Sequence, residues 1–119
     1  MKNLKINKSN RALMMIWENT YISLDALYTD SMGYETWAES ELESMDSKMN
    51  QLGLKIVKKL SKSLTIYYGY DFFELKKNPK RLCPNCKQPM NPLQCAKYPT
   101  IVCEKCLIAC HLLPEDWDF

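Results

Sequence analysis

Two Cys-x-x-Cys pairs in the last third of the chain constrain its fold more than any other feature. Cys83 pairs with Cys86, Cys103 pairs with Cys106, and 16 residues separate the two pairs. Each pair can direct two thiolates from one tight turn, and two such turns joined by a hairpin form a tetrahedral cage that suits Zn²⁺. Because four cysteines leave no open coordination position, the spacing predicts one structural zinc ion rather than a catalytic one.

Three further residues with metal-binding side chains lie near these pairs, namely Cys95, Cys110 and His111. Cys110 or His111 could replace one of the four ligands or bind a second metal, whereas Cys95 has no partner at Cys-x-x-Cys spacing. The alternative, which we favour, is a structural role, because free cysteine is often a small buried hydrophobe. His111 could act as a general base, but the sequence offers it no nucleophile and no orienting partner.

The length of 119 residues suits one compact domain, or a small domain with a metal-held appendage. No apolar run approaches the roughly 20 residues that span a bilayer, and the basic first residues lead into no signal-peptide pattern. We therefore expect a cytoplasmic protein that does not enter a membrane. In that compartment paired cysteines indicate metal binding rather than disulfides.

The charged residues are divided unevenly along the chain. Residues 12–47 hold eight acids and no Lys or Arg, whereas residues 48–106 hold twelve Lys or Arg and three acids. Such a division can mark a basic surface for nucleic acid. The alternative is that the two halves pack together and neutralise each other, and the isoelectric point of 8.2, below the value of about 9 typical of nucleic-acid-binding domains, favours it on charge alone.

Hydrophobic spacing predicts the secondary structure of the first 81 residues. The apolar runs 12–17 and 21–24 are read as strands. Residues 64–70 are also read as a strand, because they are β-branched and aromatic. Between them, apolar residues at spacings of three and four predict a helix from Tyr34 to Met45 and a second, lysine-rich helix from about 47 to 62, with Asp46-Ser47 as the break between them. The first stripe comprises Ala38, Leu42, Met45 and Met49, and the second comprises Leu52, Ile56, Leu60 and Leu64 with Val57.

These elements predict an α+β fold: a small sheet from the Met14 and Ile66 regions, two helices, and a C-terminal zinc ribbon. We place an α+β body at residues 1–81 and the ribbon with its C-terminal tail at 82–119. The terminal Trp117-Asp118-Phe119 is expected to dock on the body, because two large aromatic side chains are costly to leave in water.

Several of these segments resemble a bacterial family of uncharacterised proteins. The resemblance rests on Asn19–Asp25, on Trp37–Gly53 with its Asp46-Ser47 break, on Ile66-Tyr67-Tyr68, on the two Cys-x-x-Cys pairs and on Trp117-Asp118-Phe119. The family is described as zinc-ribbon-containing and as a candidate group of nucleic-acid-binding proteins. The resemblance implies a short variant of that family, with a ribbon held by the four cysteines.

The chain departs from the family pattern at three places. Members carry a substantial segment between the counterparts of Asp25 and Tyr34, which is nearly absent here. A glycine pair commonly follows the first cysteine pair, where this chain has Lys87-Gln88, and an arginine commonly follows the second, where it has Leu107. The absence of the glycine pair matters for the turn geometry, because glycine often permits the turn that directs amide groups to sulfur. The absence of the arginine removes a candidate phosphate contact.

Two groups of charged side chains are candidate binding residues. The basic group surrounds the ribbon and would bind nucleic-acid phosphates, with Tyr98 and Phe73 as neighbouring aromatic residues. It comprises Lys76, Lys77, Lys80, Arg81, Lys87, Lys97 and Lys105. The acidic group lies on the first predicted helix and would bind a basic protein partner, as toxin-immunity or adaptor proteins do. It comprises Glu35, Glu39, Glu41 and Glu43.

The sequence thus favours a non-enzymatic zinc-ribbon protein that binds nucleic acid, with a protein-interaction module as the alternative. An enzyme is the weakest of the three classes, because the sequence has no Ser/His/Asp set, phosphate-binding loop or open metal site. Both charged groups also have a plain explanation as solvated surface.

Overall fold

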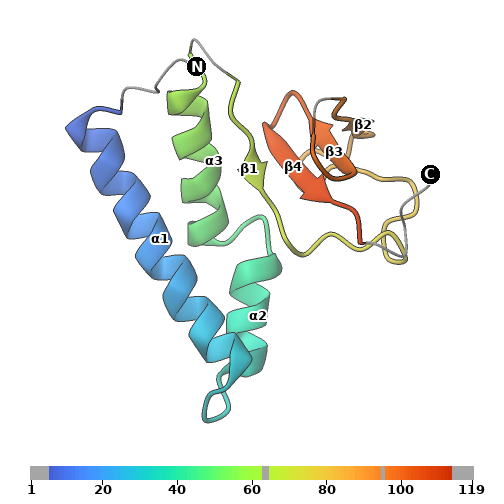
Figure 1. Ribbon diagram of the computed structural model, residues 1–119. Helices are drawn as coiled ribbons and strands as arrows, with labels where there is room; N and C mark the ends of the chain where they lie inside the picture. The colour runs from blue at the N-terminus through green and yellow to red at the C-terminus, as the bar shows by residue number, and fades with distance from the viewer. Residues whose placement is uncertain (1–5, 63–64, 95, 114–119) are drawn as a thin grey trace. The chain divides into compact units, whose positions relative to one another are not determined.

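The computed structural model describes residues 6–62, 65–94 and 96–113. Contacts within the chain divide it into two compact units, Met1–Thr65 and Ile66–Phe119. We call them the helical unit and the ribbon unit and describe each by itself (Figure 1). Cys95 and the terminal Trp117-Asp118-Phe119 lie outside the described residues.

The first helix, α1 (Lys8–Thr29), occupies the region where two strands were predicted, so that prediction was wrong. The segment contains neither Gly nor Pro, and the Asn7 side chain accepts a hydrogen bond from the Asn10 N–H at 2.8 Å, which caps the helix. Its two apolar runs look like strands when each is read alone. Read together, Leu13, Trp17 and Leu24 recur at helical spacing and share one face.

The next two helices, α2 (Glu35–Glu43) and α3 (Lys48–Leu60), confirm the pair predicted between residues 34 and 62. Ser47 caps α3 as predicted, because its hydroxyl oxygen accepts from the Asn50 N–H at 3.2 Å. Asn50 is almost fully buried. Its side-chain amide donates to the carbonyl oxygens of Leu42 at 2.9 Å and Ser44 at 2.8 Å, which fixes the turn between α2 and α3.

The core of the helical unit lies where the three helices meet. In Figure 1, α2 and α3 follow one another along the same side of α1. The apolar stripes predicted for α2 and α3 supply most of this core, together with one residue of α1. Its buried members are Leu24, Ala38, Leu42, Met45, Met49, Leu54, Ile56, Val57 and Leu60.

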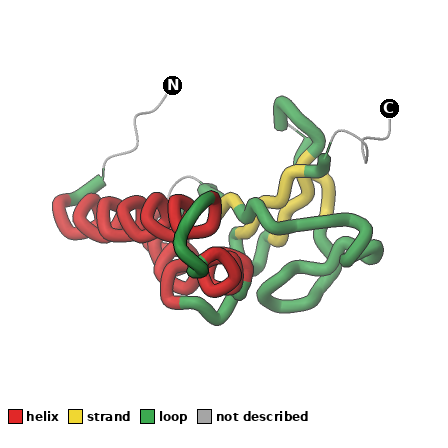
Figure 2. Tube along the Cα trace, turned by 90° about the horizontal axis from the view of Figure 1, so that it is seen from below, coloured by secondary structure: helices red, strands yellow, loops and turns green. Residues whose placement is uncertain are grey.

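The ribbon unit is built on a four-stranded mixed sheet with the order β1-β4-β3-β2. The strands are β1 (Tyr68–Gly69), β2 (Asn91–Pro92), β3 (Thr100–Cys103) and β4 (Ile108–His111). Strands β2, β3 and β4 are antiparallel neighbours, whereas β1 runs parallel to β4. In Figure 2 these strands are short, and loops form most of the unit. The α+β fold class is confirmed.

The sheet is not the one predicted from the Met14 and Ile66 regions. Met14 lies in α1, and the strand near Ile66 joins the ribbon: the Tyr70 N–H donates to the Ala109 oxygen at 2.9 Å. For this reason the boundary between the units falls after Thr65, before the position predicted at 81/82. The buried Tyr68, Tyr70 and Phe73 accordingly belong to the ribbon unit, and the core of that unit is larger than the segment from residue 82 onward could provide.

None of the helices in the described ranges has the length and apolarity needed to cross a membrane.

Candidate metal centre

Two turns of the same construction present the four cysteines. In the first, Leu82 and Pro89 form a β-bridge, and the Cys83 N–H donates to the Gln88 oxygen at 2.7 Å. The second turn connects β3 to β4. In each turn the residue after the second cysteine donates its N–H to the carbonyl oxygen of the first, at 2.9 Å for both Lys87 and Leu107.

Those two residues have left-handed backbone conformations. Lys87 has a φ of 64° and Leu107 a φ of 60°. Glycine adopts this conformation without the steric cost that a Cβ imposes. The turn geometry therefore explains why glycine suits the position after a cysteine pair, and it shows that lysine and leucine occupy the same geometry in this chain.

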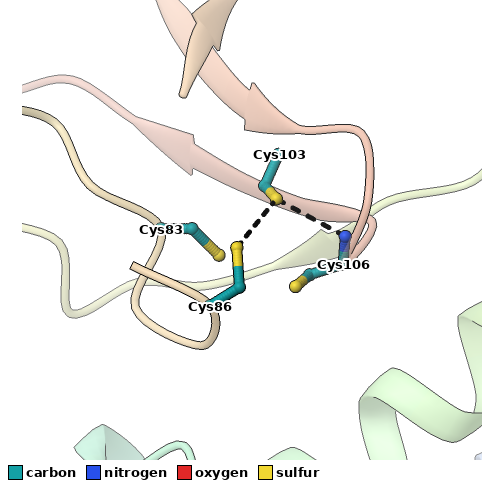
Figure 3. Close-up of side chains that lie close together, drawn as sticks. All are labelled: Cys83, Cys86, Cys103 and Cys106. Carbon is teal, nitrogen blue, oxygen red and sulfur yellow. Dashed lines mark hydrogen bonds between the residues drawn. The ribbon is translucent and has the colours of Figure 1, made fainter. Parts of the chain in front are cut away.

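The four sulfur atoms converge on one point (Figure 3). Their Sγ atoms all lie within 4.8 Å of one another, and the Sγ atoms of Cys86 and Cys103 are 3.7 Å apart. A tetrahedron of sulfurs around a zinc ion at about 2.3 Å has edges of about 3.8 Å. Cys83, Cys103 and Cys106 are buried and Cys86 is half-buried. The residues predicted as ligands are thus positioned to hold one metal ion.

Amide groups donate hydrogen bonds to the sulfurs from within the turns. The Asn85 N–H lies 3.4 Å from the Cys83 Sγ, and the Cys106 N–H lies 3.4 Å from the Cys103 Sγ. The Asn85 side-chain Nδ2 also donates to the Cys106 Sγ at 3.3 Å, so one residue contacts sulfurs of both turns. Such donors stabilise the negative charge of thiolates and orient them toward a metal.

The cysteine environments shift the thiol pKa values in opposite directions. Burial raises the pKa of Cys83 to about 12 and also raises the pKa of Cys106. A backbone hydrogen bond from Gln88 lowers the pKa of Cys86 to about 7. At neutral pH without metal, Cys83 is therefore a thiol and Cys86 is partly a thiolate. Because a metal binds thiolates, binding must release protons, and acid must weaken it.

Cys110 and His111 lie outside this cage. Cys110 is fully buried in β4, and burial together with the nearby Asp71 raises its pKa to about 12. The His111 Nδ1 lies 2.9 Å from the Thr100 hydroxyl oxygen across the β3–β4 pair. Within the described ranges, the cluster with metal-binding geometry contains the four predicted cysteines and neither of these residues.

The basic group is exposed except for Arg81, which is half-buried. The Lys77 Nζ lies 3.7 Å from the Glu74 Oε1, and the Lys97 ammonium lies 5.5 Å from the centre of the Tyr98 ring. Tyr98 is 53% exposed, whereas Phe73 is buried and is not available for stacking.

The four glutamates of the acidic group differ in exposure and in their contacts. The Glu35 carboxylate accepts the Ser31 N–H at 2.8 Å, and backbone hydrogen bonds lower its pKa. Glu35 therefore serves first to fix the start of α2. Glu39 and Glu43 are exposed on the same side of α2, whereas Glu41 is half-buried on another side.

Comparisons with protein-family models, with curated proteins and with solved structures found no match to this chain. The candidate site therefore rests on its own geometry.

Sequence reasoning missed the role of Asn85, and its side chain provides a test of the site. Replacing Asn85 by alanine removes the donor to the Cys106 Sγ and leaves all four cysteines in place. We expect zinc affinity to fall by about 10-fold, since loss of such outer contacts typically costs 10–100-fold. Competition with a chromophoric chelator measures this. The matched control is Lys105→Ala, at the equivalent position of the second turn, and an equal loss there would contradict a specific role for Asn85.

Proposed function

We propose that the four cysteines bind one Zn²⁺ ion and that this ion has a structural role. The donor set supports zinc, because four thiolates in a tetrahedral arrangement select soft or borderline metals and exclude Mg²⁺ and Ca²⁺. Four protein ligands would also leave no position for a substrate. On this basis we propose a non-enzymatic protein, and a short variant of the zinc-ribbon family that the sequence resembles.

We further propose that the ribbon unit binds nucleic acid through its basic group. The observation that carries this proposal is the charge of residues 66–113, where there are seven cations and three acids; the tail that follows adds Glu115, Asp116 and Asp118. Two of those acids already have partners: Glu74 lies beside Lys77, and Glu104 accepts a hydrogen bond from the Tyr67 hydroxyl at 2.7 Å. The remaining cations supply the positive surface that a phosphate backbone requires.

The Lys97–Tyr98 pair adds an aromatic contact to this surface. An exposed ring beside an ammonium group can stack on a base while the cation neutralises a phosphate. Because the described residues contain no recognition helix in the ribbon unit, we propose binding with little sequence preference, directed at the backbone and at unpaired bases.

The test is a titration of labelled single- and double-stranded oligonucleotides at several salt concentrations. The affinity is expected to fall steeply with salt because neutralised phosphates release counterions. The variant with Lys76, Lys77, Lys80 and Arg81 replaced by alanine should bind more weakly. For single strands its dependence of log affinity on log salt should be shallower by up to about 3, since each phosphate contact contributes about 0.7.

A control variant removes the same charge from the helical unit. Four exposed lysines outside the ribbon, Lys55, Lys58, Lys59 and Lys62, are replaced by alanine. This variant has the same net charge as the test variant. We expect it to retain most of the affinity. An equal loss in both variants would show a general effect of charge, and no binding at low salt would exclude the nucleic-acid proposal.

The alternative function is binding of a basic protein through α2. One observation favours it: Tyr34 and Trp37, beside the acidic group, are 58% and 53% exposed. Exposed aromatic side chains next to charges of one sign are typical of protein-binding surfaces. This alternative is tested by affinity purification if the oligonucleotide titration shows no binding. It is supported if the wild type retains a stoichiometric protein partner and the Trp37→Ala variant does not.

A further inference from the structure

Helix α1 has an apolar face that the helical unit does not use. Its inner face, with Leu13, Trp17 and Leu24, packs toward α2 and α3. On other sides of the helix Met15, Ile16 and Ile22 are 59%, 55% and 56% exposed. Single exposed apolar residues are common on protein surfaces. Met15 and Ile22, seven residues apart, lie on one side of the helix and form a stripe that a partner can cover, with Ile16 beside it.

The spacing of this stripe is that of a coiled-coil seam. We define the outer seam as the exposed residues at alternating spacings of three and four along α1. It comprises Ala12, Met15, Asn19, Ile22 and Ala26, all of them exposed. The alternation of three and four residues matches the a and d positions of a heptad repeat, and a polar Asn in the middle of a seam is a known determinant of pairing. The outer seam is therefore built to pack against another helix.

The charges of α1 indicate which helix this is. Its first turns carry Lys8 and Arg11, and its remaining length carries only the acids Glu18 and Asp25. When two copies of α1 pack antiparallel, Arg11 of each copy lies opposite Asp25 of the other and Met15 lies near Ile22. Parallel packing would instead leave Arg11 and Asp25 at opposite ends of the interface, where they cannot pair. The surface is thus complementary to itself under a two-fold rotation.

We propose that two copies of this protein associate through the outer seams of α1 in an antiparallel arrangement. The interface consists of apolar contacts along about 21 Å of helix, from Ala12 to Ala26, with the Arg11–Asp25 pair formed twice by symmetry. Glu18 lies near the two-fold axis, where it faces the Glu18 of the other copy. This like-charge contact weakens the dimer at one defined place.

Sedimentation equilibrium of the full-length, zinc-loaded chain tests the proposal. The wild type is expected to dimerise, and the double variant Met15→Glu/Ile22→Glu is expected to be monomeric at the same concentrations. Both positions are exposed, so the variant should keep its helix content by circular dichroism. If it does not, Met15→Gln/Ile22→Gln is the gentler replacement. The control is Met32→Glu, because Met32 is 95% exposed but lies outside α1.

Charge variants test the antiparallel orientation. Arg11→Asp and Asp25→Arg should each weaken association by roughly 3- to 10-fold, and the double variant should restore it, because surface ion pairs contribute modestly and the pair occurs twice. Glu18→Gln should strengthen association. A wild type that stays monomeric up to about 1 mM, or a dimer that survives the seam variant, would overturn the proposal. Failure of the double charge variant to restore association would overturn the antiparallel arrangement.

Discussion

Replacing Cys103 by serine is expected to abolish stoichiometric zinc binding and to unfold the ribbon unit while the three helices remain folded. Cys103 ends β3, and its sulfur lies 3.7 Å from the Cys86 sulfur, so its loss opens the centre of the cage. Structural zinc contributes an apparent free energy of about 10–16 kcal/mol in small metal-folded domains. A unit of this size obtains only about 3–5 kcal/mol from its apolar core. Elemental analysis and dispersion of the amide NMR signals measure the two effects.

The control for this variant is Cys110→Ala. It removes a cysteine that is as deeply buried as Cys83 but lies outside the cage. We expect this variant to keep one zinc ion per chain and to lose about 1 kcal/mol of stability from the small cavity. A Cys103→Ser protein that is fully folded without metal would contradict the structural role that we propose for zinc.

The cluster of four cysteines could be predicted from the sequence because local spacing sets where the sulfur atoms lie. Two residues between cysteines determine a turn, and the turn determines where both sulfurs lie, whatever the rest of the fold does. The amphipathic helices α2 and α3 were predictable for a similar reason. Their stripes recur at helical spacing, and Ser47 marks the start of α3 by a short-range hydrogen bond.

Helix α1 was mispredicted because its apolar residues lie on two faces. The inner face and the outer seam together fill the segment with short apolar runs, and such runs do not distinguish a strand from a helix. The single pattern of a one-faced helix, which Leu13, Trp17 and Leu24 would give alone, is hidden by Met15 and Ile22 on the opposite side. The feature that misled the prediction is the same one that supports the proposed dimer.

The contacts around the four cysteine sulfurs depend on tertiary structure, so the sequence contains weaker signals for them. Asn85 occupies the third position of its cysteine pair, where its backbone N–H was foreseeable as a sulfur donor. Its side-chain bond to Cys106 requires the second turn to lie against the first, which no local pattern specifies. Lysine itself gives no signal for the left-handed backbone at position 87. The sequence signal for that position was the glycine pair that commonly stands there in the family the chain resembles.

The pairing of β1 with the ribbon could not be predicted either, because the two-residue strand is held by partners about 40 residues away in the sequence. The Tyr68 N–H donates to the Leu107 oxygen at 2.6 Å, and the Tyr70 N–H donates to the Ala109 oxygen at 2.9 Å. Residue 107 directly follows a cage cysteine. The stability of β1 is thus expected to depend on the metal, although no ligand lies on that strand.

Removal of zinc by a chelator is therefore expected to erase amide-exchange protection throughout the ribbon unit, from β1 onward, and to leave protection in α1, α2 and α3. Amide protection reports local opening, and the two units have separate cores that can open independently.

The informative probe is the Tyr70 amide. If the cooperative unit begins at residue 66, Tyr70 loses protection together with β3 and β4. A Tyr70 amide that keeps its protection after β4 has opened would contradict its hydrogen bond to Ala109 and would favour the boundary at residue 82 that the sequence alone predicted. Simultaneous loss in the helices would show that the whole chain unfolds as one unit and would contradict the division into two. Hydrogen–deuterium exchange read by NMR, with and without chelator, separates the three outcomes.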